Sequence, residues 1–158
     1  MSPQATPQLR WSALRIDDLD RLLEVENQCY SHPWTRGNFI DSMAMGYAMQ
    51  LLWVDQELIG YFVAMQGVDE LHLLNITVNP RHQRQGWAKV LLDQLRSWAA
   101  TVQAQAIWLE VRISNARAQQ IYLEFGFESV GLRKRYYPVS HVEREDAMVM
   151  RYLLSTTP

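Results

Sequence analysis

The residues that decide the fold class of this chain are Leu73-Leu74-Asn75-Ile76-Thr77-Val78-Asn79-Pro80-Arg81-His82-Gln83-Arg84-Gln85-Gly86-Trp87-Ala88. The first six are mostly apolar and rich in β-branched side chains. The Asn-Pro pair after them stops the run, so a buried strand is predicted over 70–78. Beyond Gly86, apolar residues recur at helical spacing to about Ala100, which predicts an amphipathic helix. The sequence therefore predicts a buried strand, a short turn and a helix in succession.

The turn between the predicted strand and helix has features that suit a diphosphate. It contains two cations, Arg81 and Arg84, and Gly86, which has no β-carbon. Free N–H groups at a helix N-terminus favour bound anions, and cations nearby add to this preference. The turn lacks both Gly-x-x-x-x-Gly-Lys-Ser/Thr and Gly-x-Gly-x-x-Gly, which argues against a nucleotide triphosphatase and a dinucleotide dehydrogenase. An ordinary strand-to-helix turn with solvated arginines also fits these residues.

The composition restricts the class of protein. The chain has 158 residues, of which 48% are hydrophobic and 20% charged, as in one soluble globular domain. Its net charge of -2 gives no electrostatic case for a nucleic-acid or membrane partner, and neither is expected. The sequence has no long apolar run and no signal-peptide pattern, so we expect a cytoplasmic protein. We expect loose tails at 1–8 and 155–158 and one domain over 9–154.

The cysteine and histidine content bears on redox and metal chemistry. Cys29 is the single cysteine, which excludes an internal disulfide and fits a reducing compartment. It is either a small buried residue of the first helix, which we favour, or a reactive thiol. The histidines have no metal-ligand spacing and no metal is expected; they are His32, His72, His82 and His141.

The remaining segments alternate between strand and helix patterns. Their order, β-α-α-β-β-β-α-β-α-β-β, predicts one α/β or α+β domain with a mixed sheet and helices on both faces. The helices are expected from an Asp17 or Asp18 cap, from a Thr35 cap, from Gly86, and from a Ser114 cap to Gly126. The strands are expected over 9–14, 48–54, 58–65, 70–78, 106–112, 127–135 and 147–153.

The strand over 106–112 carries a candidate acid–base residue. Its alternation places Ile107, Leu109 and Val111 on one face and Glu110 on the other. Desolvation of a mid-strand carboxylate would raise its pKa toward neutrality, as a general base requires. The alternative is a Glu110–Arg112 pair on a solvated face.

The helix that follows carries a candidate proton donor. Tyr122 belongs to an apolar stripe with Ala118, Ile121 and Phe125. It is either a core tyrosine with its hydroxyl at the surface, or a phenol that protonates a departing thiolate.

A set of short segments in fixed order resembles one enzyme family. Together they resemble the GNAT acetyltransferases, and within them the RimI-type ribosomal-protein-alanine N-acetyltransferases, over roughly 14–150. Residues 83–88 are similar to the family's acetyl-CoA signature, Arg/Gln-x-x-Gly-x-Gly/Ala. The other segments are Asn75-Ile76-Thr77-Val78, Leu109-Glu110-Val111-Arg112, Ser114-Asn115, Ile121-Tyr122, Gly126-Phe127, Arg135-Tyr136-Tyr137-Pro138 and Arg144-Glu145-Asp146-Ala147, with Pro33-Trp34 upstream.

This resemblance implies the GNAT acyl-CoA N-acyltransferase fold, with about seven strands in a mixed sheet and about four flanking helices. It implies acetyl-CoA as co-substrate, with the pantetheine arm and thioester on backbone groups of Ile76, Thr77 and Val78. Asn115 would also contact the cofactor. Ala88 stands where relatives usually have glycine, and its β-carbon leaves less room for a phosphate. The residues implied around the pyrophosphate are Arg84, Gln85, Gly86, Trp87, Ala88 and Lys89.

The resemblance also implies a direct acetyl transfer with two catalytic side chains. Glu110 would remove the amine proton, Tyr122 would protonate the sulfur, and the Val78 N–H would stabilise the oxyanion. Because Cys29 lies far from these motifs in sequence, an acyl-cysteine intermediate is not expected.

The implied acceptor is the N-terminal alanine of a small-subunit ribosomal protein. At pH 7 about 10% of α-amines but only about 0.04% of lysines are neutral, which also favours an N-terminus. The alternatives are a small-amine or lysine acetyltransferase of the same family and a CoA-binding interaction module without catalysis. Trp34, Tyr136 and Tyr137 are the candidate acceptor-binding residues, and a monomer is expected.

A basic cluster, Arg133-Lys134-Arg135, precedes the acidic residues Glu143, Glu145 and Asp146. The cations are either solvated or dock an acidic surface, and the acids either pair with them or line the acceptor groove.

Overall fold

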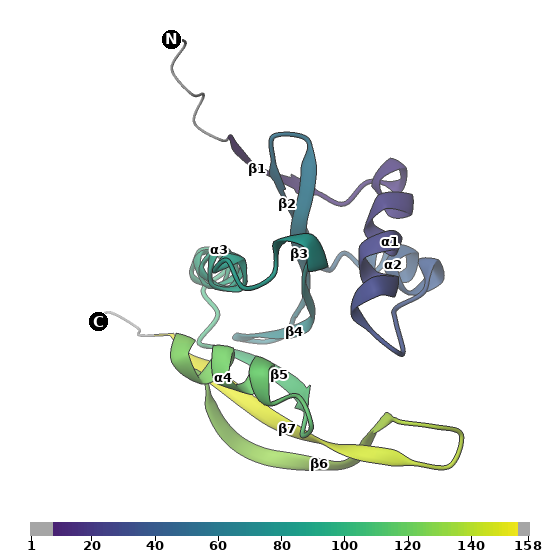
Figure 1. The fold of residues 1–158 in the computed structure, drawn as a ribbon. Coiled ribbons are helices and arrows are strands. Elements are labelled where there is room, and N and C mark those ends of the chain that lie inside the picture. The colour runs from purple at the N-terminus through teal and green to yellow at the C-terminus, as the bar shows by residue number, and fades with distance from the viewer. Residues whose placement is uncertain (1–7, 155–158) are drawn as a thin grey trace. The chain divides into compact units, whose positions relative to one another are not determined.

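The computed structural model describes residues 8–154, so the predicted tails at 1–8 and 155–158 lie outside the described residues except for Gln8. The Gln8 carbonyl accepts a hydrogen bond of 3.0 Å from the Asp55 N–H. The chain forms two compact units (Figure 1). The first unit contains residues 8–63 and 75–87, and the second contains 64–74 and 88–154.

Seven strands form one mixed sheet in the order β1-β2-β3-β4-β5-β7-β6. The pair β4–β5 is parallel, whereas β1–β2, β5–β7 and β6–β7 are antiparallel. This architecture confirms the prediction of seven strands in a mixed sheet. The strands are β1 Leu9–Ala13, β2 Ala48–Val54, β3 Glu57–Gln66, β4 Glu70–Val78, β5 Ala106–Arg112, β6 Glu128–Pro138 and β7 Arg144–Leu153.

In residues 8–154, four α-helices accompany the sheet, as predicted, together with two short 3-10 helices. Thr35 caps α2 as expected, because its side-chain oxygen accepts from the Asn38 N–H at 3.1 Å. The helices are α1 Leu19–Cys29, α2 Arg36–Ala44, α3 Trp87–Thr101 and α4 Ala116–Phe125, with η1 Ile16–Asp18 and η2 Pro80–His82.

One predicted cap differs from the structure, and another occupies its predicted position without a capping hydrogen bond. The cap of α4 is Asn115 and not Ser114, since the Asn115 Oδ1 accepts from the Ala118 N–H at 3.1 Å. Asp18 precedes α1, but its carboxylate accepts from the Arg15 N–H at 3.0 Å and from no helix N–H. The correction from Ser114 to Asn115 concerns a choice between adjacent polar residues, which the sequence pattern alone does not resolve.

The core of the first unit lies between α1, α2 and the central strands. Leu19 and Leu22 of α1 are buried, and Phe39 of α2 packs edge-on against Tyr61 of β3 at 6.2 Å between ring centroids. Because Tyr61 also contacts α1 through Glu26, both helices cover the same face of β3. This packing holds α1 and α2 against β3 in the first unit.

The core of the second unit lies between its helices and the C-terminal strands. Leu91, Leu92 and Leu95 of α3 are buried, and Ile107, Leu109 and Val111 of β5 are buried as their alternation predicted. In α4, Phe125 packs on Tyr152 of β7 at 5.3 Å between ring centroids. The opposite face of β5, which carries Glu110, is left half-buried.

Strand β6 carries extra residues relative to its partner. Arg133 pairs with Ala147 and Tyr137 with Glu145, so four steps along β6 correspond to two along β7. Arg135, inside this bulge, has a positive φ of 54°. The bulge determines which β6 side chains reach β5.

Candidate active site

In the first unit, the end of β4 is held by side chains of α1 and the residue after it. The Tyr30 hydroxyl donates to the Ile76 carbonyl at 2.9 Å and lies 2.8 Å from the Thr77 Oγ1. The Val78 carbonyl accepts from the Cys29 thiol at 3.5 Å and from the Gln83 Nε2 at 3.2 Å. The backbone predicted to contact the pantetheine arm is therefore fixed by hydrogen bonds within this unit.

The turn after β4 is anchored to β3. The Asn79 N–H donates to the Ile59 carbonyl at 2.7 Å, and its Nδ2 donates to the Leu58 carbonyl at 2.9 Å. Residues 83–86 beyond this anchor are exposed. Arg84 and Gly86 have positive φ angles of 65° and 87°. The turn thus ends in an exposed, left-handed glycine directly before α3.

Gly86 meets the requirements of an anion cradle at a helix N-terminus. A β-carbon placed on it would meet no atom within 4 Å, so the space beside its backbone is open. Arg81 lies 3.7 Å from Glu57, whereas Arg84 forms no ion pair within residues 8–154. The Trp87 Nε1 donates to the Gln85 Oε1 at 3.2 Å, which ties two of the predicted cofactor residues together. An open backbone and a free guanidinium fit a diphosphate.

Two other predicted cofactor residues, Ala88 and Lys89, lie in the first turn of α3 in the second unit. The Lys89 ammonium is 3.9 Å from the Asp93 carboxylate, one turn further along the helix. Asn115, also in this unit, uses its side-chain oxygen to cap α4. Its amide nitrogen is the group it can offer to a ligand.

Glu110 of β5 is the centre of a charged cluster in the second unit. Its side chain is 10% exposed, and one carboxylate oxygen contacts the His72 Nε2 from β4. The other oxygen accepts from the Arg133 Nη1 of β6 at 3.1 Å. The alternative pairing with Arg112 is wrong, because Arg112 donates to Glu145 at 2.8 Å.

No local sequence pattern connects His72 with Glu110. His72 lies opposite Trp108 in the β4–β5 register, two residues before Glu110, so the two side chains share a face. A signal for this contact exists only once the two strands are paired in the correct register.

Tyr136 and Tyr137 gather around Glu110 in the same unit. The Tyr137 hydroxyl donates to the Glu110 carbonyl at 3.0 Å, and burial raises the pKa of this phenol. The Arg133 guanidinium lies 4.9 Å from the centre of the Tyr136 ring. Tyr137 therefore fixes the β5 backbone, while Tyr136, with 38% of its surface exposed, is the more available of the two.

Tyr122 lies on α4 with its ring against Phe127, at 5.7 Å between centroids. Burial raises its pKa to about 12. The phenol therefore keeps its proton at neutral pH, which a general acid requires. Its hydroxyl forms no hydrogen bond with another residue of 8–154.

Relatives with known names and structures match almost the whole chain. Residues 19–127 match the model of the acetyltransferase (GNAT) family. The chain belongs to the GNAT acetyltransferase family. It is 35% identical over 138 residues to the ribosomal protein bS18-alanine N-acetyltransferase of Haemophilus ducreyi, covering 87% of this chain and 94% of the relative. The Escherichia coli K12 enzyme of the same name is 32% identical over 144 residues, covering 91% and 97%.

A solved structure confirms the fold. The crystal structure of the ribosomal-protein-S18-alanine N-acetyltransferase from Escherichia coli has a TM-score of 0.86 and 30% identity, and covers 96% of this chain and 97% of that chain. The chain is thus a single GNAT-fold domain and an acetyl-CoA-dependent N-acetyltransferase related to the bS18-alanine enzymes.

Cys29 of this acetyltransferase lies closer to the cofactor strand than its place in the sequence suggests. Its thiol donates to the Val78 carbonyl at 3.5 Å, so distance in sequence is no measure of distance in the fold here, and the case against an acyl-cysteine intermediate depends on the state of the thiol. Burial, and then the charge of Glu26, raise the pKa of the thiol to about 11. Because only the thiolate is a competent nucleophile, this shift opposes an acyl-cysteine route.

Trp34, the third candidate acceptor residue, belongs to the loop between α1 and α2. Its ring is half-buried against Phe39, at 5.1 Å between centroids, and its backbone N–H donates to the Glu26 carboxylate at 2.9 Å. The loop is therefore fixed at Trp34 by both its ring and its backbone.

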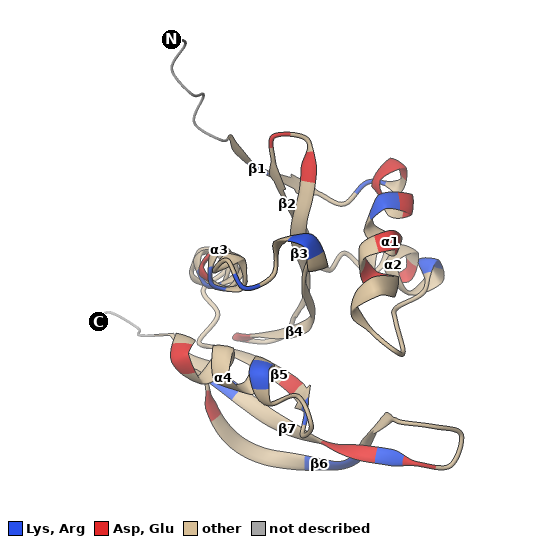
Figure 2. Cartoon of the chain, in the orientation of Figure 1, with Lys and Arg blue, Asp and Glu red and all other residues tan. Residues whose placement is uncertain are grey.

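The basic and acidic runs of this acetyltransferase lie on neighbouring strands of the hairpin. Figure 2 shows cations on β6 beside acids on β7. Their contacts are selective: Arg133 bonds Glu110, and Asp146 accepts from the Arg135 N–H at 2.9 Å. Hydrogen bonds from Arg112 and Ser114 lower the pKa of Glu145. The alternative in which these acids pair directly with the basic side chains is therefore wrong, because each group makes a separate contact.

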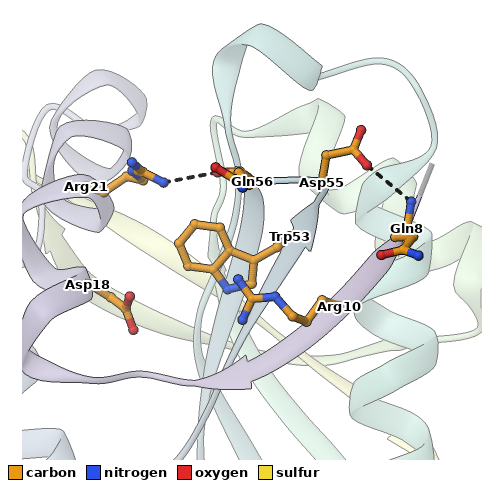
Figure 3. Close-up of a pocket in the computed structure, with 7 residues that line it drawn as sticks. All are labelled: Gln8, Arg10, Asp18, Arg21, Trp53, Asp55 and Gln56. Atoms are coloured by element: carbon orange, nitrogen blue, oxygen red, sulfur yellow. Dashed lines mark hydrogen bonds between the residues drawn. The ribbon is translucent and has the colours of Figure 1, made fainter. Parts of the chain in front are cut away.

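A surface pocket of about 640 Å³ lies beside the β2–β3 turn of the first unit (Figure 3). Arg10 and Arg21 both approach the Trp53 ring, at 5.1 and 5.7 Å, and the Arg21 Nη1 donates to the Gln56 carbonyl at 3.1 Å. The pocket contains no predicted cofactor or catalytic residue. Its lining residues are Gln8, Arg10, Asp18, Arg21, Trp53, Asp55 and Gln56.

Within residues 8–154, no group of three or more His, Cys, Asp or Glu side chains is arranged to hold a metal ion. Within the same range, no helix has the length and apolar character needed to span a bilayer.

Proposed function

We propose that this acetyltransferase transfers the acetyl group of acetyl-CoA to the α-amine of the N-terminal alanine of ribosomal protein bS18. The observation that carries the proposal is the match of 87–91% of the chain to relatives that bear this activity in their names. The cluster around Glu110 supports it, because it supplies a fixed carboxylate for the proton of an incoming amine. With a ribosomal protein as acceptor, the reaction takes place in the cytoplasm.

In the proposed reaction the neutral amine attacks the thioester carbonyl directly. The C–N bond forms and the C–S bond breaks, with the Val78 N–H as donor to the oxyanion. Glu110 takes the amine proton and Tyr122 gives its proton to the CoA sulfur. Exchange with solvent then restores both side chains. The pKa of about 12 for Tyr122 supports its role, since the phenol enters each cycle protonated.

The proposed cofactor site uses backbone more than side chains. The open space at Gly86 and the free guanidinium of Arg84 support binding of the pyrophosphate at the turn. The hydrogen-bonded end of β4 supports a fixed position for Ile76, Thr77 and Val78. Asn115, Gln85, Trp87, Ala88 and Lys89 complete the proposed set.

The acceptor amine also favours this assignment. The pKa of an α-amine is about 8 and that of a lysine about 10.4, which gives the N-terminus a roughly 250-fold larger neutral fraction at pH 7. Trp34 and Tyr136 are the proposed contacts for the acceptor peptide, together with Tyr137.

The test is acetyl transfer to a short peptide that begins with the N-terminal sequence of bS18, followed by mass spectrometry. The control peptide has a blocked α-amine and a free internal lysine. Acetylation of the free N-terminus alone is expected. Modification of the blocked peptide would assign a lysine acetyltransferase instead. No transfer to either peptide, with acetyl-CoA binding intact, would indicate a small-amine substrate or a module without catalysis.

A further inference from the structure

Glu26 of α1 is a charged side chain for which the proposed reaction has no role. Only 1% of its surface is exposed, and it forms no ion pair within residues 8–154. A carboxylate buried without a cation requires hydrogen-bond donors to offset the loss of water. The donors around Glu26 therefore show which segments this residue connects.

Three donors from three segments converge on this carboxylate. The Tyr61 hydroxyl of β3 donates to Oε1 at 2.7 Å, and the Asn75 Nδ2 of β4 donates to the same oxygen at 3.1 Å. The backbone N–H of Trp34, in the loop between α1 and α2, donates to Oε2 at 2.9 Å. The Glu26 side chain thus connects β3, β4 and the loop that carries Trp34, a predicted acceptor-binding residue.

The bridge continues along β4 beyond Asn75. The Thr77 Oγ1 donates to the Asn75 Oδ1 at 2.7 Å and lies 2.8 Å from the Tyr30 hydroxyl, which donates to the Ile76 carbonyl. Asn75 and Thr77 are both buried. A buried network of this kind holds its members in one arrangement when every group is satisfied.

We propose that Glu26 is a positioning residue that holds the acceptor loop, residues 30–35, and the cofactor end of β4, residues 75–78, in one arrangement. The proposal rests on the proposed function, which assigns these two segments to acceptor and cofactor. Alignment of two bound reactants is sensitive to displacements of about 1 Å, so a common support for both segments acts on their relative placement.

A carboxylate is the side chain that this position requires. Tyr61, Asn75 and Trp34 all present hydrogens to it, and a carboxylate only accepts. A glutamine of the same shape would turn its NH₂ group toward at least one of these donors. Glu26→Gln therefore removes hydrogen bonds at unchanged volume, which makes it the informative variant.

The experiment measures two constants for Glu26→Gln: the Kd of acetyl-CoA by calorimetry and the KM of the N-terminal alanine peptide. We expect both to rise about tenfold, because both segments lose the same support. Thr77→Val removes the hydrogen bonds of the Thr77 hydroxyl to Asn75 and Tyr30 but leaves Glu26 bonded to Trp34, so it should raise the Kd of acetyl-CoA more than it raises the peptide KM. Ile59→Val removes one buried methylene from the same strand as Tyr61 but no hydrogen bond, and controls for lost stability.

Tyr61→Phe is the second variant, in case Glu26→Gln does not fold. It removes one donor and keeps the carboxylate, and should raise both constants by about threefold. If these variants lower the melting temperature but leave both constants within about twofold of Ile59→Val, the carboxylate is structural only and the proposal is overturned. If the wild type acetylates no peptide, the proposed function fails. The acetyl-CoA Kd then still decides whether Glu26 supports β4.

Discussion

Glu26 in the first unit and Glu110 in the second are both carboxylates close to the predicted chemistry, but their partners differ. Glu26 is 1% exposed and accepts from a hydroxyl, an amide and a backbone N–H. Glu110 contacts His72, and it bonds the guanidinium of Arg133, itself 52% exposed. Neutral donors in the interior hold Glu26 in one position, whereas the partners of Glu110 are partly exposed to solvent. The contrast supports the proposed roles, which are positioning for Glu26 and proton transfer for Glu110.

Of the substitutions that test this comparison, removing the carboxylate of Glu110 should have the largest effect on kcat. Glu110→Gln should lower kcat by about 10²–10⁴-fold, because the amine loses its proton acceptor, with no change in acetyl-CoA affinity. Initial rates and calorimetry measure the two quantities. Glu145→Gln, which removes a carboxylate paired with Arg112 in the same unit, is the matched control and should cost less than about threefold. Equal losses in both variants would sink the role of Glu110.

The proton donor should be the next most sensitive group. Tyr122→Phe should lower kcat by about 10²-fold. In the wild type, kcat should not fall between pH 8 and pH 10, because burial raises the pKa of Tyr122 to about 12 and the phenol stays protonated. A pH–rate profile checks this. The control Tyr152→Phe removes a hydroxyl from the same aromatic cluster and should leave kcat almost unchanged. A fall in kcat near pH 9 that is abolished in Tyr122→Phe would contradict the raised pKa.

A smaller effect is expected from the cation beside Glu110. Arg133→Met keeps the length of the side chain but removes the 3.1 Å hydrogen bond, and should lower kcat about three- to tenfold. Lys134→Met removes the adjacent exposed cation and should change kcat by less than twofold, as roughly expected for a solvated charge. Steady-state kinetics of both variants distinguishes the local contact of Arg133 from the general charge of the hairpin. Comparable losses of kcat in the two variants would favour the general charge.

The smallest effect concerns Cys29, which borders the Glu26 network. Its folded pKa of about 11 lies above that of an unfolded thiol, about 8.5, so the stability it contributes is present below pH 8.5 and is lost toward pH 11. The difference in unfolding free energy between wild type and Cys29→Ala should therefore shrink over this range in urea titrations. Alkylation by iodoacetamide at pH 8 should be at least about tenfold slower in the folded protein than in urea. Equal rates would contradict the shift.

Local signals in the sequence predicted most of the fold. An apolar, β-branched run that ends at Asn79-Pro80 predicts β4 at Glu70–Val78, period-2 alternation fits β5 at Ala106–Arg112, and a Thr35 cap begins α2. The hairpin strands β6 and β7 run past their predicted ends, because pairing with each other extends them beyond the apolar run. Local patterns do not report such pairing energy.

The candidate site was predictable where it depends on residue type and not where it depends on contact. Glu110 stands out as a carboxylate in a buried strand, but its partners His72 and Arg133 come from strands 38 and 23 residues away. The sequence of α1 does not distinguish Glu26 from the other polar residues of that helix, because its partners lie on other elements. The apolar pattern of a helix predicts which face is buried but not which hydrogen-bond donors contact that face.

Because of the bulge in β6, the number of residues between Arg133 and Tyr137 affects the contacts of Glu110. Arg133 and Tyr137, which both contact Glu110, are separated by residues that have no counterparts on β7. Loss of a single residue from 134–136 would reverse the side of the sheet that one of them faces, whatever its identity. An insertion at 140–142, in the hairpin turn, would leave both in register. In homologues that share this bulge, we therefore expect insertions and deletions to be rare at 134–136 and common at 140–142.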